Sequence, residues 1–428
     1  MDINNHNNHI NHNIQNHNHP TGNPMSINAI NNPEERHPVK RYHEEASTSN
    51  KKLRNENLIK LKEHDFPTKN FFEEHGIEIV NENQISSLKS EFMQLFGCKQ
   101  TEFKFPGSLP ISLNNTRLRQ INKTYFVSEK TDGLRCCLFI PKDQSGVYIV
   151  DRKFKISALK NCDDMIPLYS QNGATLIDGE IVSNLDRNEM VFMIFDLVAL
   201  DGSNERGKIF QDRLFSLGGI VKLYRSNKDK IPFEIIAKIF HPVKNIASIL
   251  KSFATTTDGK RVYNDQDKRF HFTDGIIFAA NIPYQNRTNK SMFKWKYPEL
   301  ISVDFKLSFK EPPRNLNKWS EYLWFSCFDD DLQDIFCRRA EFSPEQWKLI
   351  ERDISILGKS VNLNLYQTLL QKPIIIECCF NRNSGLWIYH KIRADKTDPN
   401  HISIVFDTLE SIAENITEKD ICEFIKNI

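Results

Sequence analysis

The sequence predicts an α+β fold in which a mainly antiparallel sheet is followed by a small barrel of about five strands and by closing helices. Short β-branched or aromatic runs separated by turn residues fill residues 125–200, as is typical of antiparallel strands. Longer apolar patterns at 210–224 and 243–253 predict helices that lie on this sheet. Tyr297-Pro298 interrupts the first set of strands, and a second set begins at Val303.

Each element is predicted from its apolar spacing and from the turn or cap residues beside it. The first helix is expected at 85–96, where Gly97 provides a C-cap. The strands expected in the first sheet are 125–127, 134–140, 147–150, 175–182 and 190–200. The second set comprises strands 303–309, 324–328, 374–380 and 386–392, a helix at 344–357, and closing helices at 403–409 and 418–428.

The composition is ordinary for a globular protein with room for two or three domains. Of 428 residues, 39% are hydrophobic and 26% charged. The formal net charge is only +2, so nucleic-acid binding would need a local basic patch. No apolar run approaches the roughly 20 residues of a membrane-spanning helix, and no signal peptide is visible. We therefore expect no membrane partner and a location inside the cell.

The nine cysteines predict buried free thiols in a reducing compartment. Cys136-Cys137 and Cys378-Cys379 are adjacent pairs, and neighbours in a strand point to opposite faces, which suits neither a disulfide nor a chelate. No CxxC occurs.

Residues 1–33 are dominated by asparagine and histidine and are expected to be disordered, because their apolar content is too low to offset the entropy of ordering. Their histidines could bind metal weakly, but a low-complexity tail is the simpler interpretation. Lys40-Arg41 and Lys51-Lys52-Leu53-Arg54 form two basic clusters that are compatible with a nuclear-import signal.

The segment Glu129-Lys130-Thr131-Asp132-Gly133 offers a candidate nucleophile in Lys130. A lysine attacks phosphorus only after losing its proton, which burial or nearby cations promote. Tyr125-Phe126-Val127 would cover it, and Gly133 would let the backbone turn close to a ligand. Taken alone, the segment is more typical of a surface turn.

Lys294 and Lys296 lie two apart in a predicted strand, so both would point to one face, roughly 7 Å apart, with Trp295 packed on the other. An anion such as a triphosphate would relieve their repulsion; an exposed edge strand is the alternative. Asp178 and Glu180 likewise share a face and could orient a ribose or help to hold Mg²⁺, or could simply face solvent.

Arg393-Ala394-Asp395-Lys396 concentrates charge in a turn after a predicted strand, from which it could reach a phosphate bound by another domain. Such clusters are often only solvated. The sequence contains no Walker-type GxxxxGK[ST], no GxGxxG after a first strand, no zinc-ligand spacing and no GxSxG. The common alternatives for a nucleotide enzyme therefore lack support.

These segments, in this order, resemble the signature of covalent nucleotidyltransferases, and most closely that of the mRNA capping enzymes, the GTP:RNA guanylyltransferases. Lys130-Thr131-Asp132-Gly133 matches the family's KxDG, and the segment 105–112 is similar to the one that precedes it. Asp274-Gly275-Ile276-Ile277 resembles the DGLI strand, and 293–298 resembles LKWKP. Ser302-Val303-Asp304-Phe305 continues the capping-type pattern and favours capping enzymes over DNA ligases. Residues 393–400 match the closing motif.

The resemblance implies a role for each candidate residue. Lys130 would become guanylated, and Glu180 and Asp274 would hold the metal ion. The positions expected to bind the nucleotide are Arg135, Arg152, Phe154, Asp178, Glu180, Lys294, Lys296, Arg393, Asp395 and Lys396. The implied organisation is a leader at 1–60, a nucleotidyltransferase domain at 61–304, an OB-fold β-barrel domain at 305–400 and C-terminal helices at 401–428.

The resemblance also implies the reaction: GMP would pass from GTP, with Mg²⁺ (or Mn²⁺), through lysyl-GMP to the 5′-diphosphate end of RNA, forming a GpppN cap. The N-terminal region lacks the HCxxxxxR of a cysteine phosphatase, so a separate RNA 5′-triphosphatase is expected. The phosphorylated tail of RNA polymerase II is a further expected partner, and the nucleus the expected location. The alternatives are an ATP-dependent polynucleotide ligase and a catalytically inactive OB-fold module that binds nucleic acid.

Overall fold

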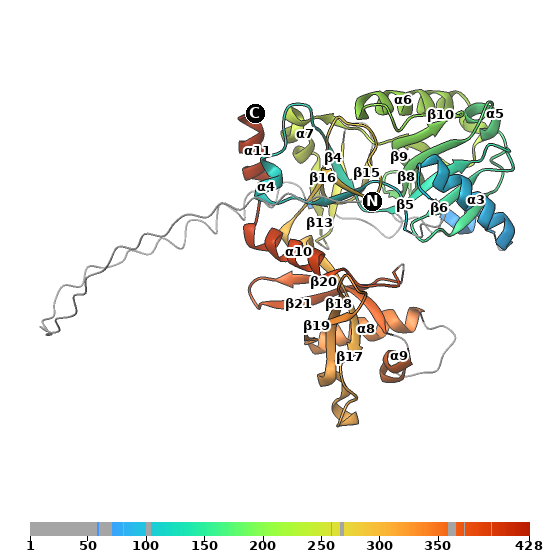
Figure 1. Cartoon of the computed structure of the whole chain (residues 1–428). Coiled ribbons are helices and arrows are strands. Elements are labelled where there is room, and N and C mark those ends of the chain that lie inside the picture. Colours follow the sequence, from blue (N-terminus) through green and yellow to red (C-terminus); the bar gives the residue numbers. More distant parts are fainter. Residues whose placement is uncertain are drawn as a thin grey trace, which may run out of the picture. The chain divides into compact units, whose positions relative to one another are not determined.

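A computed structural model describes residues 58–59, 71–79, 81–99, 104–257, 259–265, 269–357, 365–371, 373–394 and 396–428 (Figure 1). The histidine-rich leader and both basic clusters lie outside the described residues. Among the residues described, no helix is long and apolar enough to cross a membrane.

The strands form three sheets. Sheet I contains β1 Leu58–Ile59, β3 Leu109–Ser112, β4 Phe126–Thr131, β12 His241–Pro242, β13 Phe253–Thr256, β14 Arg261–Asn264, β15 Phe270–Ala279 and β16 Thr288–Lys296. Sheet II contains β2 Gly76–Glu78, β5 Leu134–Ile140, β6 Tyr148–Asp151, β7 Ile156–Leu159, β8 Thr175–Asn184, β9 Glu189–Leu200, β10 Ser203–Asn204 and β11 Ile235–Ala237. Sheet III contains β17 Ser302–Phe309, β18 Leu323–Phe328, β19 Asp334–Arg339, β20 Ile374–Asn381 and β21 Leu386–Ile392.

The pairing confirms the predicted mixed fold with mainly antiparallel sheets. Most described strand pairs are antiparallel, and the parallel ones are β1 with β13, β11 with β9, and β16 with β3. In sheet I, β15 pairs with β4, β14 and β16, so it brings residues near 130, 275 and 295 side by side. In sheet II the order is β10-β9-β8-β5-β6-β7-β2.

The helices lie mostly where apolar spacing predicts them. They are α2 Phe71–His75, α3 Glu82–Leu95, α4 Asn115–Leu118, α5 Met165–Tyr169, α6 Phe210–Ser226, α7 Ile246–Lys251, α8 Pro344–Leu357, α9 Leu365–Gln371, α10 Ile402–Glu414 and α11 Glu418–Lys426. Short 3-10 helices are η2 Lys228–Lys230, η3 Val243–Asn245, η4 Pro298–Leu300 and η5 Leu316–Tyr322. Gly97 follows α3 with φ +66°, the left-handed conformation expected of a C-cap glycine.

The helix predicted at 243–253 is shorter than expected. It consists of η3 and α7, and Phe253 instead begins β13, where it pairs with Tyr263 of β14 and is buried in the core of sheet I. Sheet pairing therefore overrides the helical spacing at the end of this segment.

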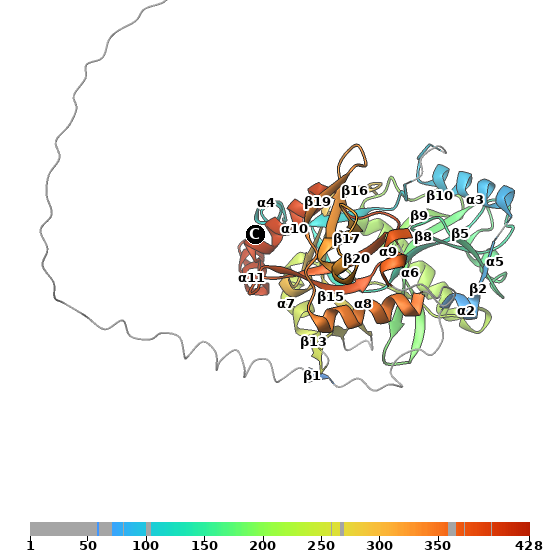
Figure 2. The same cartoon turned by 90° about the horizontal axis from the view of Figure 1, so that it is seen from below.

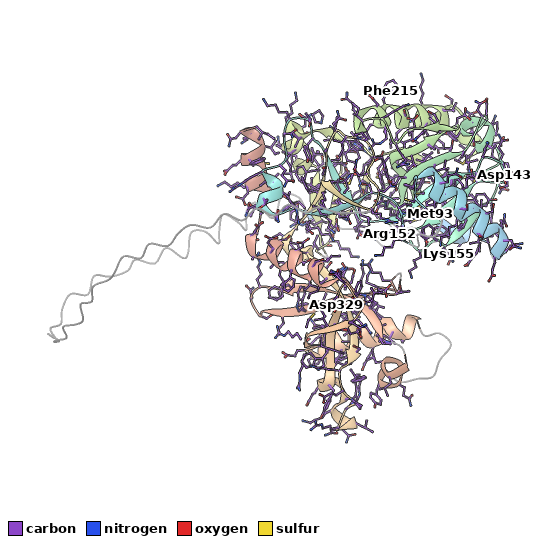
Figure 3. All side chains as sticks on the ribbon, in the orientation of Figure 1. Met93, Asp143, Arg152, Lys155, Phe215 and Asp329 are labelled. Carbon is purple, nitrogen blue, oxygen red and sulfur yellow. The ribbon has the colours of Figure 1, made fainter. Side chains whose placement is uncertain are left out.

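Apolar residues cover both faces of sheet II. Helix α6 packs against β9 and β11 on one face (Figure 1), where Leu217 and Ile220 meet Cys136 and Ile194. Phe92 and Phe96 at the end of α3 belong to the cluster on the other face, together with Cys137. Phe215 projects from α6 away from this core and is 87% exposed (Figure 3).

The cysteines are free, as predicted, and Cys136 and Cys137 point into different clusters. The expectation that all nine are buried is wrong: Cys337 is exposed, and Cys98, Cys379 and Cys422 are partly exposed. Cys337 is exposed because β19, which carries it, is an edge strand of sheet III.

The five strands of sheet III are ordered β19-β18-β17-β20-β21, and α8 packs against β21. Figure 2 shows β17, β20 and α8 from below. The number of strands agrees with the prediction, but the closed barrel is not found: among the described strands, β19 and β21 do not pair. Instead, the side chain of Arg338 donates a hydrogen bond across the gap to the Gly385 carbonyl (2.7 Å). The backbone hydrogen bonds between β19 and β21 that a closed barrel requires are therefore replaced by a side-chain contact.

Helices α10 and α11 pack into two different hydrophobic cores. Val405 and Ile412 of α10 are buried with the residues of sheet III, whereas Ile421 and Ile425 of α11 are buried with those of sheet I. The indole Nε1 of Trp295 donates to the Ile416 carbonyl between the two helices (2.8 Å), which confirms that this side chain points into packing.

A buried ion pair fixes α6 on sheet II. Arg213 is 3% and Asp196 4% exposed; Nε of Arg213 lies 2.6 Å from Asp196 Oδ1, and Nη2 lies 3.1 Å from Oδ2. Nη1 also donates to the carbonyls of Lys208 (2.6 Å) and Ile282 (3.0 Å). All three guanidinium nitrogens thus donate hydrogen bonds inside the protein.

We expect Arg213→Met to lower the free energy of unfolding by roughly 3–5 kcal/mol, because it leaves a buried carboxylate without its partner. Chemical denaturation would measure the change. Lys419→Met, which breaks an exposed ion pair with Glu423, should have little effect. Equal losses in the two variants would contradict the structural role of the Arg213 pair.

Candidate active site

Lys130 lies in the middle of sheet I rather than in a surface turn. It is on β4, opposite Gly275 of β15, and Lys296 of β16 lies opposite Gly275 on the other side. Strand β16 has β15 and β3 as neighbours, so the alternative of an exposed edge strand is excluded. The three strands therefore bring the two lysines to the same level of the sheet.

Gly275 is the position where a side chain cannot be placed. A Cβ atom there would lie 1.9 Å from the Trp295 carbonyl oxygen, and the residue has φ +156°. Gly133 is also required for packing, since a Cβ would lie 2.6 Å from the Ile181 carbonyl of β8. The close approach at Gly133 is thus to the neighbouring strand β8.

The Asp274 carboxylate bridges both lysines. Nζ of Lys130 lies 2.9 Å from Oδ1 and 3.1 Å from Oδ2, and Nζ of Lys296 lies 2.7 Å from Oδ2. Burial raises the pKa of Asp274, but the two ammonium groups outweigh it and hold that pKa at about 2. The Lys130 side chain is 22% exposed, so a ligand can reach it.

Lys294 completes the basic cluster two residues before Lys296. Burial, followed by repulsion from Lys296 and Lys130, lowers the pKa of Lys294 to about 7. The pKa of Lys296 is raised because Asp274 outweighs its burial. The site therefore contains three lysines and one shared carboxylate, an arrangement that favours an anion.

The opposite face of β4 carries a polar cluster that the sequence did not reveal. Glu129 is buried beside Lys238 (Oε1 to Nζ, 3.8 Å) and His271 (Oε1 to Nε2, 3.3 Å). Lys238 Nζ also donates to Thr131 Oγ1 (2.5 Å). Burial would raise the pKa of Glu129, but Lys238 and His271 hold it at about 2. No local signal marks Lys238 or His271, because they are distant in sequence and meet only through strand pairing.

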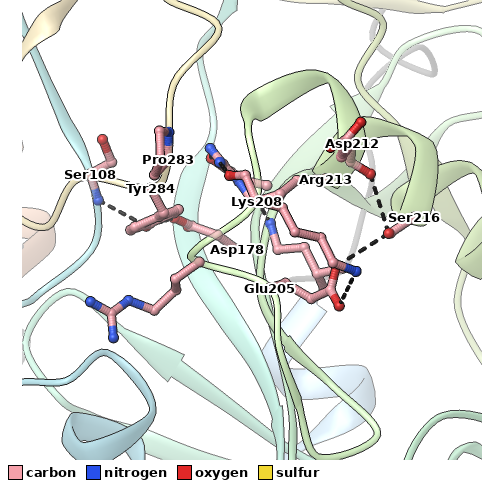
Figure 4. Close-up of polar contacts among 12 residues, drawn as sticks. Ser108, Asp178, Glu205, Lys208, Asp212, Arg213, Ser216, Pro283 and Tyr284 are labelled. Atoms are coloured by element: carbon pink, nitrogen blue, oxygen red, sulfur yellow. Dashed lines mark hydrogen bonds and ion pairs between the residues drawn. The ribbon is translucent and has the colours of Figure 1, made fainter.

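Asp178 is fully buried and holds Arg135 rather than facing the basic cluster. Nε and Nη2 of Arg135 donate to its two oxygens at 3.1 and 2.6 Å. The Tyr284 hydroxyl donates to Asp178 (2.7 Å) and accepts from the Ser108 N–H (2.9 Å; Figure 4). Arg135 Nη1 donates to the Ser108 carbonyl (2.5 Å), so Ser108 is held at both its backbone groups. Burial lowers the pKa of Arg135, but Asp178 outweighs this and raises it.

Glu180 lies on β8 opposite Arg135 of β5 and is partly buried. Burial raises the pKa of its carboxyl against the opposing influence of Lys238 and Lys130. Within the described residues, no three histidine, cysteine or acidic side chains gather to form a metal site. Mg²⁺ commonly uses one or two carboxylates plus phosphate oxygens, so Glu180 and Asp274 fit its donor preference.

Arg152 and Phe154 lie in the turn between β6 and β7 (Figure 3 labels Arg152). Asp151 organises this turn by accepting from the backbone N–H groups of Lys153 and Lys155, each at 2.8 Å. Phe154 has φ +61° and packs against Phe92 and Phe105. Its ring therefore lies in the aromatic cluster, with Lys89 Nζ 4.4 Å from the ring centroid.

Arg393 and Lys396 meet at Asp304 of β17. Arg393 Nη1 lies 2.9 Å from Asp304 Oδ1, and Lys396 Nζ donates to Asp304 Oδ2. Lys153 of the β6–β7 turn donates to the Ala394 carbonyl (3.1 Å), so the two segments touch. Asp395 lies outside the described residues. The predicted cations thus form two groups, Lys130 and Lys296 around Asp274 and Arg393 and Lys396 around Asp304, whereas Arg135 pairs separately with Asp178.

A partly buried lysine in a sheet, flanked by two further lysines and a shared carboxylate, is suited to covalent transfer of a nucleotide. The fold and site define a nucleotidyltransferase. The family model described as mRNA capping enzyme, catalytic domain, matches residues 72–298, and that described as mRNA capping enzyme, C-terminal domain, matches residues 300–422. The chain belongs to the mRNA capping enzyme family.

Curated relatives agree with this assignment. The chain is 25% identical over 363 residues to the mRNA-capping enzyme subunit alpha of Schizosaccharomyces pombe, covering 79% of this chain and 84% of that protein. It is 26% identical over 399 residues to that of Saccharomyces cerevisiae, covering 81% and 84%. Among solved structures, mycobacterial DNA ligase D complexed with ATP and MES overlaps 68% of this chain and 96% of that chain at 15% identity, with a TM-score of 0.34.

We expect Lys294→Met to raise stability most below pH 7. The folded-state pKa of Lys294, about 7, lies below its ordinary value of 10.5. Between these two values the folded protein binds fewer protons than the unfolded chain, so stability rises with pH there, and the destabilisation by the buried amine is fully present below pH 7. Removing the amine should remove that slope, with a gain on the order of a few kcal/mol at pH 6. Denaturation at pH 6 and pH 10 would measure it.

Lys296→Met is the matched control for that measurement. Its folded-state pKa is raised, so its stabilisation is present below the ordinary pKa and is lost only as pH rises through the folded value. This variant should lose stability at neutral pH. The same response in both variants would refute the assignment of opposite environments.

Proposed function

We propose that this protein is an mRNA guanylyltransferase that transfers GMP from GTP, through a covalent lysyl-GMP on Lys130, to the 5′-diphosphate end of RNA. The observation that carries the proposal is the position of the Lys130 amine, which shares the Asp274 carboxylate with Lys296 and lies beside Lys294. Membership of the capping enzyme family supports the choice of GTP and RNA as substrates.

In the first step, the neutral amine of Lys130 attacks the α-phosphorus of GTP. A nitrogen–phosphorus bond forms, the bond from the α-phosphorus to the bridging oxygen breaks, and pyrophosphate leaves. Lys294 and Lys296 offset the charge that develops on the phosphoryl oxygens. Mg²⁺ or Mn²⁺, held by Glu180 and Asp274 with phosphate oxygens, would add further positive charge.

In the second step, a terminal oxygen of the RNA 5′-diphosphate attacks the same phosphorus, and the Lys130 nitrogen leaves. Both steps develop negative charge at one place, so the same lysines serve both. Arg135, Arg152, Phe154 and Asp178 form the nucleoside end of the proposed site. The fully buried Asp178 would act through Arg135, because their bidentate pair fixes both Arg135 and Ser108.

Arg393, Asp395 and Lys396 belong to the proposed OB-fold domain, residues 305–400, and act on the outgoing phosphates when that domain closes on the nucleotidyltransferase domain, residues 61–304. Arg393 and Lys396 pair with Asp304, and a nucleotide phosphate would replace this carboxylate as their partner. Closure would favour the first step and opening would admit RNA. The helices at 401–428 complete the proposed domain organisation.

The relatives named subunit alpha support a separate partner subunit, which we propose is an RNA 5′-triphosphatase that supplies the diphosphate end. We further propose that the protein acts in the nucleus and contacts the phosphorylated tail of RNA polymerase II. The leader at 1–60, which carries the basic clusters, would supply the import signal.

Incubation with GTP radiolabelled at the α-phosphate, followed by denaturing electrophoresis, should leave label on the wild-type chain. Lys130→Ala should reduce the label to background, because no other described side chain occupies that position. Label that persists on Lys130→Ala, or its absence from the wild type, would refute the proposal. Labelling with ATP but not GTP would instead indicate a polynucleotide ligase.

Arg393→Ala should slow formation of the GMP-protein by roughly 10²-fold, because one cation is lost from the developing phosphate charge. Transfer of GMP from the isolated intermediate to RNA should slow less, since pyrophosphate has already left. Lys391→Ala, which removes a neighbouring lysine paired with Glu377, provides the control. Equal slowing of both steps would contradict a role confined to the triphosphate.

A further inference from the structure

One face of sheet III is not part of the hydrophobic core. Val303, Phe305 and Leu307 of β17 point into the core, but Trp324 of β18 and Phe336 of β19 lie on the other face and join none of the apolar clusters. Their ring centroids are 6.3 Å apart at 86°, and both side chains are partly exposed. Two large aromatic residues on a face without core packing are available to a partner.

Basic side chains surround these rings. Lys310 Nζ lies 5.0 Å from the centroid of Trp324 and 5.8 Å from that of Phe336. Arg339 is opposite Trp324 on β19 and is exposed, and within the described residues it makes no ion pair. The hydroxyls of Ser308 and Ser326 on the same face are buried and lie 3.5 Å apart.

Strand register connects this face with the loop that carries Arg393 and Lys396, which we propose contacts the phosphates of the nucleotide. Phe336 is opposite Ser326, Ser326 is opposite Lys306, and Lys306 is opposite Ile375. The backbone N–H of Arg393 donates to the Ile375 carbonyl (2.8 Å). A single row across the sheet therefore leads from Arg393 to Phe336, and Trp324 lies opposite Ser308, two residues (roughly 7 Å) along β17.

Carboxylates limit the path on one side. Asp304 and Glu377 face each other two residues from Lys306 and Ile375, and Asp334 pairs with Lys306. A polyanion would avoid the residues level with Asp304 across the sheet and would lie over those level with Lys306 and Ser308. There Lys310 and Arg339 supply positive charge, and within the described part of the chain neither forms an ion pair. The net formal charge of the chain is only +2, so this local patch is the kind of feature that nucleic-acid binding requires.

We propose that the face formed by Trp324, Phe336, Lys310 and Arg339 binds the first nucleotides of the single-stranded RNA acceptor. This inference rests on the proposed function, because it assumes that RNA receives the GMP. Bases stack on aromatic rings without regard to sequence, and lysine and arginine contact the phosphates. Such a surface suits an acceptor whose 5′ diphosphate is fixed but whose sequence varies.

Direct binding tests the surface without the reaction. We would measure fluorescence anisotropy of a labelled 5′-diphosphate oligoribonucleotide with wild type, Trp324→Ala, Phe336→Ala and Lys310→Ala. Each aromatic substitution should weaken binding by about 5- to 150-fold. Lys310→Ala should also lower the slope of log affinity against log salt by about 0.7. Phe215→Ala, which removes an exposed aromatic side chain from α6, should bind as wild type does.

The two half-reactions separate this inference from the proposed function. Trp324→Ala should raise the KM for RNA in GMP transfer, and the formation of GMP-protein from GTP alone should persist. Loss of GTP labelling in the wild type would refute the proposed function, but anisotropy would still decide whether this face binds RNA. Trp324→Phe, which keeps a stacking surface, should restore most of the affinity, and thermal melting would show whether each variant is folded.

Two results would overturn the inference. The first is RNA affinity that is unchanged in the folded Trp324→Ala and Phe336→Ala variants. The second is a surface that binds an acidic phosphopeptide while RNA neither binds nor competes, which would assign the same residues to a protein partner.

Discussion

The Asp274 carboxylate, shared by the ammonium groups of Lys130 and Lys296, is the interaction on which the rest of the site depends. Three lysines brought together in one sheet would repel one another, and the single carboxylate reduces that repulsion while the site holds no phosphate. It also keeps Lys130 in place. A triphosphate brings more negative charge than one carboxylate, so it can take over the lysines from Asp274.

The same exchange recurs at Asp304, where Arg393 and Lys396 have a carboxylate partner on their own sheet. Lys130, Lys296, Arg393 and Lys396 therefore each have an internal anion whose charge a nucleotide phosphate can replace. Such pairs preorganise the cations, because the side chains are already gathered before substrate arrives. The same carboxylates also compete with the ligand for these cations. Arg135 differs, since its bidentate bond to buried Asp178 is permanent architecture.

Much of the fold followed from local pattern. The bounds of α8 and β21 agree with the sequence, and Gly97 ends α3 as a C-cap glycine. Edge strand β19 was missed because its exposed, charged residues lack apolar alternation, and β13 was mistaken for the end of a helix because Phe253 fits both spacings. Lys238 and His271 were missed because their burial around Glu129 depends on pairing between distant strands.

The sequence by itself determined the strand types, the lysine and glycine positions, and the resemblance to capping enzymes, because these depend on residue identity and short spacing. Only the tertiary structure decided which groups pair: Asp274 binds Lys130 and Lys296, and Asp178 binds Arg135. It also decided that sheet III does not close into a barrel. The pair Lys130–Asp274 joins residues 144 positions apart, and the Tyr284 hydroxyl that also holds Asp178 is 106 positions away from it. A one-dimensional pattern carries no information about which carboxylate reaches which cation.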